Sequence, residues 1–368
     1  MVVTVSFELD SVMVENAVRT SELATRVISK LGSAVPVKFV ADGREAARPQ
    51  RSAADPFTAG KRTMVVMRRR APFLMACPAG SAEFACCGYL VLNLASNCPM
   101  DCSYCFLQEY LADNPAFQIY ANYHDAFDEL DALLRKSPNR HFRVGTGELA
   151  DSLAFDSLTG MSRDLVEFFS RRERLMLELK TKTDEIDNLM GIDPRGRTLV
   201  SWTLSPESVF RSSEHKTAAP SARINAARSL LENGYKVAFH FDPIIAYPQA
   251  ERDYLELLAL LFDSIAPEKI SFVSMGGLRM TPALRKTART RFPTDPMLVG
   301  EEVLSSDGRY RAFAALRTNL YRSIEKRLKE FAPGLPRYLC MESASVSERV
   351  FGVRPQHPAE LGDRLASR

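Results

Sequence analysis

The stretch that decides the fold is residues 97–106, NCPMDCSYCF, in which Cys98, Cys102 and Cys105 follow the pattern Cys-x3-Cys-x2-Cys. Soft thiolate ligands favour iron–sulfur clusters, and three of them can hold three irons of a cubane 4Fe–4S cluster. The fourth iron then has no protein ligand, so a substrate or cofactor can bind there. We therefore expect these three cysteines to be the metal ligands of a redox-active cluster.

The alternatives for this cysteine group are a zinc site and ordinary buried thiols. Zinc usually takes four Cys or His ligands, and the next histidine, His124, stands 19 residues after Cys105. Six of the seven cysteines fall within 29 residues, which fits metal or redox chemistry in a reducing compartment better than a disulfide framework. We expect Cys86 and Cys87 to be small apolar packing residues.

The composition is that of a globular protein, with 46% hydrophobic and 25% charged residues in 368. A formal net charge of +3 neither demands nor excludes a nucleic-acid partner. Glu8, Asp10 and Glu15 interrupt the first residues, so we expect no secretory signal there. The longest apolar region, residues 73–95, contains a proline, two glycines and a glutamate, which does not suit a membrane span. These features predict a cytoplasmic protein.

From about residue 86 the chain alternates short apolar runs with amphipathic segments. The predicted strands are Tyr89–Leu94, Phe142–Gly145, Leu175–Leu179, Leu199–Leu204, Val237–Phe241 and Ile270–Val273. The predicted helices between them are His124–Leu134, Ser162–Ser170, Ala218–Asn233, Glu251–Ser264 and Pro282–Thr290. Such alternation predicts parallel βαβ units of the α/β class. Right-handed crossovers would close them into a partial (β/α)6 barrel, with chemistry at the carboxyl ends of the strands.

The sequence further predicts three parts. Residues 1–60 form a small N-terminal α/β unit, with strands at Val2–Glu8 and Val35–Val40, a helix at Val18–Leu31 and a connector at Arg44–Lys61. Residues 61–300 form the partial barrel, which a short strand in Lys61–Arg70 introduces. Residues 301–368 form a C-terminal helical extension, dominated by a long helix at Tyr310–Phe331.

The cysteine spacing, with Tyr104 before the last cysteine, resembles the radical S-adenosylmethionine superfamily. The resemblance implies that the fourth iron binds the amino and carboxylate groups of S-adenosylmethionine, and that one electron, from a donor such as flavodoxin or ferredoxin, yields a 5′-deoxyadenosyl radical. Residues 145–148, GTGE, resemble the superfamily's Gly-Gly-Glu element. Gly147 would allow close approach of the cofactor, and the Glu148 carboxylate suits its amine. A glycine turn with a solvated glutamate is the alternative.

Over nearly its whole length the chain resembles the spore photoproduct lyase family. The matching stretches are KRTMVV at 61–66, CFLQ at 105–108, DSLT at 156–159, TK at 181–182, IDNL at 186–189, NGYK at 233–236 and RMTP at 279–282. The resemblance implies a partial barrel, one cluster, S-adenosylmethionine, and DNA or another nucleic acid as substrate. By position, Lys182 matches a lysine for the cofactor carboxylate, Thr203 a serine near the cofactor, and Tyr104 the motif's aromatic residue. Ser205, at the end of the fourth strand, carries a hydroxyl that can bond a ribose or carboxylate.

One departure concerns the hydrogen donor. The resemblance implies a cysteine just after the second strand that returns hydrogen to the product radical, but residues 145–152 contain none. Cys340 could replace it only if the C-terminal segment folds over the barrel mouth; otherwise Cys340 is a buried cysteine. This departure favours a sister branch with another substrate.

The substrate therefore stays open at this point. The basic stretches Arg68–Arg70 and Arg285–Arg291 could contact phosphates, although such clusters are usually solvated faces. The chain could also be a radical enzyme that modifies a peptide or small metabolite. A third possibility is a non-catalytic iron–sulfur or nucleic-acid-binding relative that retains the scaffold.

Overall fold

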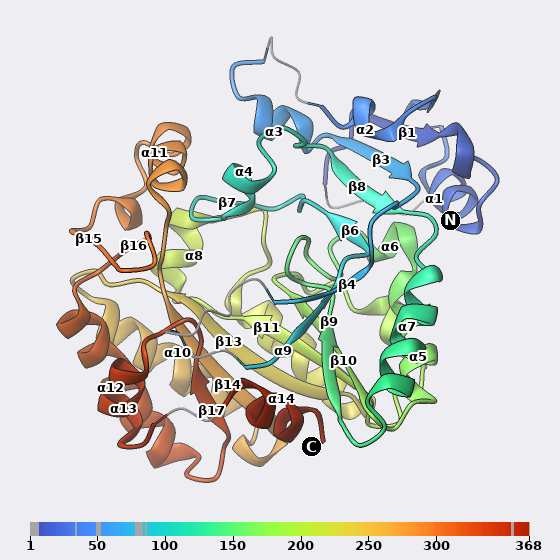
Figure 1. The fold of residues 1–368 in the computed structure, drawn as a ribbon. Helices are drawn as coiled ribbons and strands as arrows, with labels where there is room; N and C mark the ends of the chain where they lie inside the picture. Colours follow the sequence, from blue (N-terminus) through green and yellow to red (C-terminus); the bar gives the residue numbers. More distant parts are fainter. Residues whose placement is uncertain are drawn as a thin grey trace.

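The computed structural model describes residues 7–33, 35–48, 53–77, 84, 87–354 and 357–367. A curled eight-stranded sheet forms the body of the molecule, and a five-stranded sheet lies above it in Figure 1. The large sheet has the order β17-β14-β13-β11-β10-β9-β5-β4. Its strands are β4 (Leu74–Ala76), β5 (Leu90–Leu92), β9 (Phe142–Gly145), β10 (Leu175–Thr181), β11 (Thr198–Thr203), β13 (Lys236–Ile244), β14 (Ile270–Gly277) and β17 (Arg337–Leu339).

The six predicted strands are confirmed as β5, β9, β10, β11, β13 and β14, all parallel to their neighbours within this group. They are apolar because the sheet is covered on both faces: every residue of β11 is buried. Two further strands extend the sheet. The short β4 pairs antiparallel with β5, and β17 pairs parallel with β14. The C-terminal extension is therefore not purely helical, because it supplies a seventh parallel strand.

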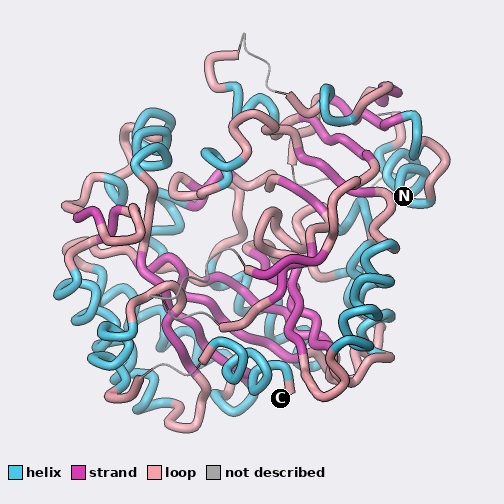
Figure 2. Tube along the Cα trace, viewed as in Figure 1, coloured by secondary structure: helices cyan, strands magenta, loops and turns pink. Residues whose placement is uncertain are grey.

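Amphipathic helices pack outside the sheet, as Figure 2 shows in cyan around the magenta strands. They are α5 (Asp125–Lys136), α7 (Met161–Ser170), α8 (Glu207–Ser213), α9 (Pro220–Glu232), α10 (Ala250–Ser264), α11 (Pro282–Arg291), α12 (Ala314–Phe331) and α13 (Ala344–Phe351). The predicted helices are confirmed within a few residues at their ends. Capping fixes one start: the Thr281 hydroxyl accepts a hydrogen bond from the Leu284 amide at 3.0 Å, and Pro282 opens α11.

The inner face of the barrel is layered, because alternate residues of each strand point inward. The lowest layer is apolar and includes Met176, Leu199 and Phe272; the C-terminal helix α14 (Pro358–Ala366) closes it with Leu361 and Leu365. Above it lies a buried polar layer of Arg143, Glu178, Ser201, His240, Ser274 and Tyr338, joined by hydrogen bonds. The top layer, at the carboxyl ends of the strands, forms the mouth.

The N-terminal sheet has the order β2-β1-β3-β8-β6. Its strands are β1 (Ser11–Glu15), β2 (Val37–Val40), β3 (Thr63–Met67), β6 (Ala95–Ser96) and β8 (Phe117–Tyr120), and α1 (Glu22–Leu31) packs beside it. Three of the five strands come from beyond residue 60, so residues 1–60 do not form this sheet alone. The division into parts at residues 60 and 300 stays a prediction.

Two N-terminal predictions need comment. The strand predicted at Val2–Glu8 lies mostly outside the described residues, and the first described strand is β1. The connector predicted at Arg44–Lys61 contains two short helices, α2 (Gly43–Ala46) and α3 (Pro56–Gly60), because Asp42 and Asp55 cap their first amides. In the described part of the chain, no helix combines the length and apolarity that a bilayer span requires.

Candidate active site

The cysteine loop, residues 97–106, is docked to the barrel at two places. The Asn97 amide donates to the Leu149 carbonyl at 2.8 Å, just beyond β9, and the Asn97 side chain accepts from the Cys98 amide at 2.7 Å. Asn97 has a φ of 71°, a conformation that asparagine tolerates better than most residues. Further on, β7 (Asp101–Cys102) pairs antiparallel with β12 (Glu214–His215). The loop therefore connects the segment after β9 to β12, which follows β11.

Asp101 holds the loop from outside. Its carboxylate lies 3.0 Å from the Lys61 ammonium and 3.0 Å from the Arg291 guanidinium. Burial opposes ionisation of Asp101, but the two cations outweigh it and lower the pKa of the carboxyl. Arg291 also bonds Asp55 at 2.9 Å. Arg291 therefore fixes the cysteine loop through its ion pair with Asp101.

The three thiols are free, and Cys102 and Cys105 lie close enough to Cys98 to influence the charge of its thiol. Cys98 and Cys105 pack against Phe57, Leu107 and Leu111, and Cys102 and Cys105 share a second apolar cluster that includes Val209. Within the described residues, no three His, Cys, Asp or Glu side chains converge as the ligands of a single metal ion do. A cubane places each thiolate on a different iron and needs no fourth protein ligand. This donor set therefore fits a three-cysteine cluster and does not fit tetrahedral zinc.

Three of the predicted cofactor residues converge on Glu214. The Tyr104 hydroxyl donates to its carboxylate, Ser205 does so at 2.8 Å, and the Lys182 ammonium lies 4.0 Å away. Arg223, completely buried, binds the other oxygen of Glu214 at 2.6 Å. Burial would raise the pKa of Glu214, but Arg223 and Lys182 outweigh it and hold it at about 2. Glu214 is thus a permanent anion under the cysteine loop.

The other predicted cofactor residues lie around this group. Thr203 ends β11, is buried, and accepts a hydrogen bond from Arg223 at its carbonyl oxygen, at 2.8 Å. The Lys182 amide donates to Asp151 at 2.8 Å. We call the cysteine loop, Lys182, Ser205, Glu214 and Arg223 together the cysteine-loop side of the mouth.

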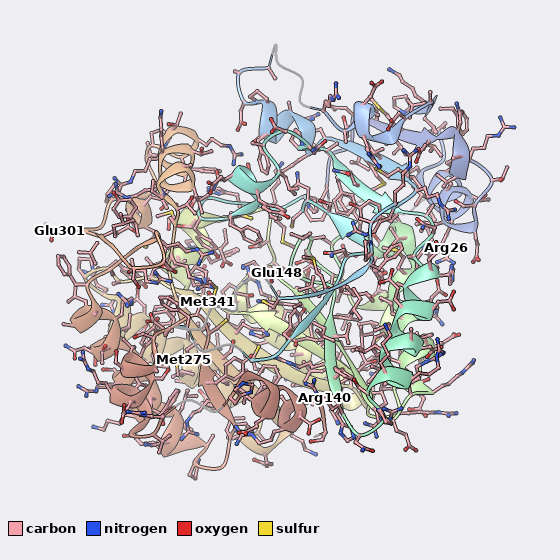
Figure 3. The ribbon with its side chains drawn as sticks, in the orientation of Figure 1. Arg26, Arg140, Glu148, Met275, Glu301 and Met341 are labelled. Atoms are coloured by element: carbon pink, nitrogen blue, oxygen red, sulfur yellow. The ribbon has the colours of Figure 1, made fainter. Side chains whose placement is uncertain are left out.

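Glu148 belongs to a different group. It faces Lys180, Asp242 and Arg279, and burial raises the pKa of its carboxyl while the two cations oppose the shift. Figure 3 shows Glu148 near the centre of the molecule, above the barrel strands. Asp242 and Arg279 form a two-pronged ion pair at 2.9 and 3.2 Å. We call Glu148, Lys180, Asp242, Arg279 and Cys340 the β17 side of the mouth.

Glycines make room for three side chains of the mouth. A Cβ at Gly147 would lie 2.6 Å from the Cβ of Lys180, and one at Gly276 would lie 3.0 Å from the Asp242 carboxyl. A Cβ at Gly145 would overlap the Tyr89 ring. The Tyr89 hydroxyl is buried and has no hydrogen-bond partner in the part of the chain that the structure describes. Gly147 therefore leaves room for Lys180, and its predicted role in the close approach of the cofactor stays a prediction.

Cys340 lies at the carboxyl end of β17, directly at the mouth. Its amide donates to the Met275 carbonyl at 2.7 Å, and the next residue, Met341, contacts Arg279 through sulfur at 3.0 Å. Asp242, Arg279 and Lys180 are the charged groups that face the thiol, and burial raises its pKa. The C-terminal segment thus reaches the mouth, as a hydrogen-donor role for Cys340 requires.

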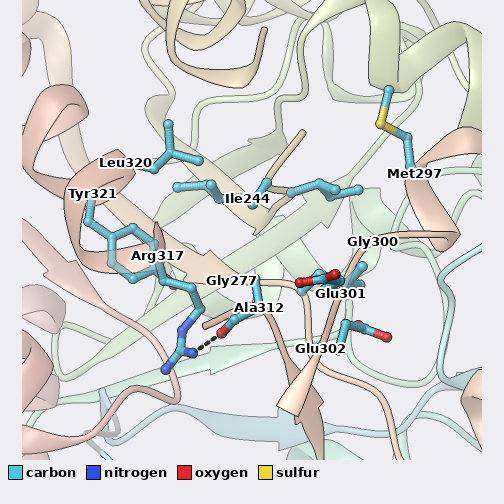
Figure 4. Close-up of a pocket in the computed structure, with 13 residues that line it drawn as sticks. Ile244, Gly277, Met297, Gly300, Glu301, Glu302, Ala312, Arg317, Leu320 and Tyr321 are labelled. Atoms are coloured by element: carbon cyan, nitrogen blue, oxygen red, sulfur yellow. Dashed lines mark hydrogen bonds between the residues drawn. The ribbon is translucent and has the colours of Figure 1, made fainter. Parts of the chain in front are cut away.

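A pocket lies beside the mouth, between the ends of two barrel strands and α12 (Figure 4). Ile244 and Gly277, at the ends of β13 and β14, form one wall, and α12 forms another. Arg317 and Tyr321 of α12 bind Glu342 at 2.8 and 3.0 Å, two residues after Cys340. The position of Cys340 therefore depends on a helix that follows the barrel.

The two basic stretches are largely engaged within the protein. Arg68 pairs with Asp125 and Arg70 with Glu15, while Arg285 and Arg289 share Glu302. Cys86 lies outside the described residues, and Cys87 is buried in the lowest apolar layer as expected.

Sequence reasoning missed Glu214, Arg223 and Lys180. No periodic signal marks Glu214, which lies in a two-residue strand between helices. Lys180 had a signal: it stands two residues after Glu178 on one strand, so both point inward.

Three comparisons with known proteins agree. The family model described as spore photoproduct lyase matches residues 8–330. The spore photoproduct lyase of Clostridium acetobutylicum is 23% identical over 269 residues, covering 73% of this chain and 77% of that protein. That of a Geobacillus species is 27% identical over 236 residues, covering 63% and 67%.

The fold matches a solved spore photoproduct lyase double mutant with bound AdoMet and dinucleoside spore photoproduct. The TM-score is 0.81 at 20% identity, covering 91% of this chain and 99% of that one. The predicted partial barrel is thereby confirmed. With the family model matched over residues 8–330, this chain belongs to the spore photoproduct lyase family of radical S-adenosylmethionine enzymes.

Proposed function

We propose that this chain is a radical S-adenosylmethionine lyase that acts on a pyrimidine lesion in DNA. The observation that carries the proposal is the position of the three-cysteine loop, held over a barrel mouth that contains charged groups and a thiol. The curated relatives are named spore photoproduct lyases, and one solved relative is complexed with the dinucleoside lesion.

The cysteine-loop side would hold the cofactors. Cys98, Cys102 and Cys105 would bind a 4Fe–4S cluster, and Tyr104, Lys182, Thr203 and Ser205 would orient S-adenosylmethionine. When bound, this pair supplies a 5′-deoxyadenosyl radical that abstracts hydrogen. Gly147 and Glu148 would meet the cofactor amine from across the mouth. An electron donor of the flavodoxin or ferredoxin class would provide the reducing electron.

Cys340 would return the hydrogen atom. Its S–H bond would break as a C–H bond forms at the product carbon that carries the unpaired electron. The remaining thiyl would regain one electron and one proton, with the electron from the same class of donor. Burial supports this role, because a raised pKa keeps the thiol protonated at neutral pH, and a thiolate has no hydrogen atom to give.

Cofactor turnover with and without ultraviolet-irradiated DNA tests the function. Reconstituted protein should bind about four irons and should form 5′-deoxyadenosine, with lesion loss detected by mass spectrometry. A protein that binds no iron would contradict the proposal. Cofactor cleavage that damaged DNA leaves unchanged would favour a peptide or metabolite substrate, and bound metal without cleavage would favour a non-catalytic relative.

A separate pair of variants tests Cys340. Cys340→Ala should keep the iron content and cofactor cleavage but give less repaired product, with adducts or unrepaired radical products in its place. Cys87→Ala removes a nearby buried thiol of the lowest layer and should leave the product distribution unchanged. If Cys340→Ala forms repaired product as the wild type does, Cys340 is not the donor.

A further inference from the structure

Lys180 is a charged side chain in the barrel mouth, and no group in the described part of the chain binds its ammonium directly. Among the described residues, its ammonium makes no hydrogen bond and no ion pair within 4 Å, and Glu148 likewise makes none. Burial would lower the pKa of Lys180, but Asp242 and Glu148 outweigh it and raise the pKa, so the ammonium stays charged. Lys180 is partly buried, and an ammonium that loses part of its hydration without gaining a hydrogen bond is destabilised. A ligand atom that accepts a hydrogen bond would complete this site.

The backbone around Lys180 is built to keep its side chain in the mouth. The Lys180 amide donates to the Ser152 hydroxyl at 3.0 Å, and its carbonyl accepts from the Ser152 amide at 3.1 Å. Gly147 leaves the space that the first carbons of the lysine occupy. Both the strand end and the opposite loop therefore position this one side chain.

The charge around Lys180 indicates what kind of ligand fits. The cations are Lys180, Arg279 and Arg143, and the carboxylates are Glu148, Asp242 and Glu178. The positive and negative groups balance, and Arg279 and Arg143 are already bound to Asp242 and Glu178. A phosphate would bring an uncompensated negative charge to this group. A neutral group with carbonyl oxygens, such as a pyrimidine ring, would not.

Lys180 and the Cys340 thiol belong to the same side of the mouth, close enough for each group to influence the charge of the other. A base held by Lys180 would have its ring next to that thiol. The same wall would then both hold the substrate and return hydrogen to it.

We propose that Lys180 donates a hydrogen bond to a carbonyl oxygen of the pyrimidine lesion and holds the reacting ring beside Cys340. This inference rests on the proposed function, because it assumes a pyrimidine substrate. It assigns substrate recognition to a residue of the β17 side, whereas Lys182, two positions later, faces the cofactor residues of the cysteine-loop side.

Binding of a dinucleoside photoproduct without a bridging phosphate tests the assignment by calorimetry. Lys180→Met should weaken binding at least about 10-fold, since hydrogen bonds to charged groups contribute strongly. Lys180→Arg should retain most of the affinity because it keeps a charged donor. Lys182→Met is the reciprocal control: it should weaken S-adenosylmethionine binding and leave the affinity for the lesion unchanged. Circular dichroism and the iron–sulfur absorbance would verify that each variant is folded.

The outcomes separate the two proposals. If Lys180→Met binds the lesion as tightly as the wild type does, the role of Lys180 is overturned and the proposed function is not affected. If the variant loses affinity only for lesions that contain a phosphate, the ligand is the phosphate and the carbonyl assignment is wrong. A wild type that neither binds nor converts the lesion would overturn the proposed function, and this assignment with it.

Discussion

The two sides of the barrel mouth are built in opposite ways. On the cysteine-loop side the charged groups are paired: Glu214 binds Arg223, and Asp101 binds Lys61 and Arg291. On the β17 side, Asp242 and Arg279 are paired, but Lys180 and Glu148 have no direct partner within the described residues. Pairing lets the protein hold a loop in place before anything binds. Partly buried charged groups without a partner indicate where a ligand can supply the missing contact.

The largest effect that would sharpen this comparison is expected from Cys102→Ala. Removing one of three thiolates should abolish cluster binding and cofactor cleavage, because the chain offers no replacement ligand in this loop. Affinity for the dinucleoside lesion should change little, since that contact belongs to the β17 side. Iron analysis and calorimetry measure the two properties separately. Joint loss of both, in a folded variant, would mean that the two sides are not independent.

The next largest effect is the difference between the free energies of unfolding lost in Glu214→Gln and in Asp242→Asn. Glu214→Gln leaves Arg223, which is fully buried, without a counter-charge and should destabilise the fold by about 3–5 kcal/mol. Asp242→Asn affects Arg279, whose side chain is 19% exposed, and should cost roughly 1–2 kcal/mol. Denaturant unfolding gives both values. Equal costs would contradict the view that the cysteine-loop side is the more rigid one.

As the pH falls, the β17 side should lose stability before the cysteine-loop side does. Burial, with Lys180, lowers the pKa of His240 to about 4, although Glu178 opposes the shift. Because this pKa lies below that of the unfolded chain, the unfolded chain binds the proton first, and stability falls as the pH drops from about 6.5 to 4. His240 lies under the β17 side, so this side should be affected. The pKa of Glu214 is about 2, so its contribution is lost only below about 4.5.

Hydrogen exchange at a series of pH values would follow this order. Between pH 6.5 and 5, amides of β13, β14 and β17 should lose protection before those of residues 98–105 and 214–223. The reverse order would contradict the assignment. His240→Gln, which does not titrate, should remove most of the difference.

The smallest effect concerns the glycine that admits Lys180. Gly147→Ala should destabilise the protein by about 1–2 kcal/mol, because the added Cβ overlaps the Cβ of Lys180. Gly334→Ala, where nothing lies within 4 Å of the added atom, is the matched control and should change stability much less. Thermal unfolding measures both. If Gly147→Ala has no effect, the space at Gly147 is not needed for the lysine.

Much of the barrel could be predicted because its signals are local. Phe142–Gly145 agrees with β9 at both ends, and α10 begins one residue before the predicted Glu251. Short apolar runs between amphipathic segments indicate buried parallel strands wherever they occur. The N-terminal sheet was harder to predict from the sequence, because β3 and β8 join it from beyond the predicted boundary.

The candidate site residues also divide into those that local sequence signals predicted and those whose neighbours only the fold determines. Tyr104, Lys182 and Ser205 stand at motif positions or strand ends, and the structure brings them together. Glu148 also stands at a strand end, but it faces Lys180 and Arg279 rather than this group. Which neighbour a mouth residue meets depends on the curvature of the whole sheet, and no local pattern encodes that.

The sequence by itself determined the three-thiol donor set and the order of strands and helices, because both depend on residues a few positions apart. Only the tertiary structure decided that Cys340 lies at the mouth. That position requires β17 to pair with β14, more than 60 residues earlier, and α12 to hold Glu342. Long-range pairing also created the surroundings of Lys180, which has no direct partner among the described residues, because they come from its own strand β10, from β13 and from the segments after β9 and β17. The cysteine loop thus follows from spacing, and the substrate-facing wall follows from packing.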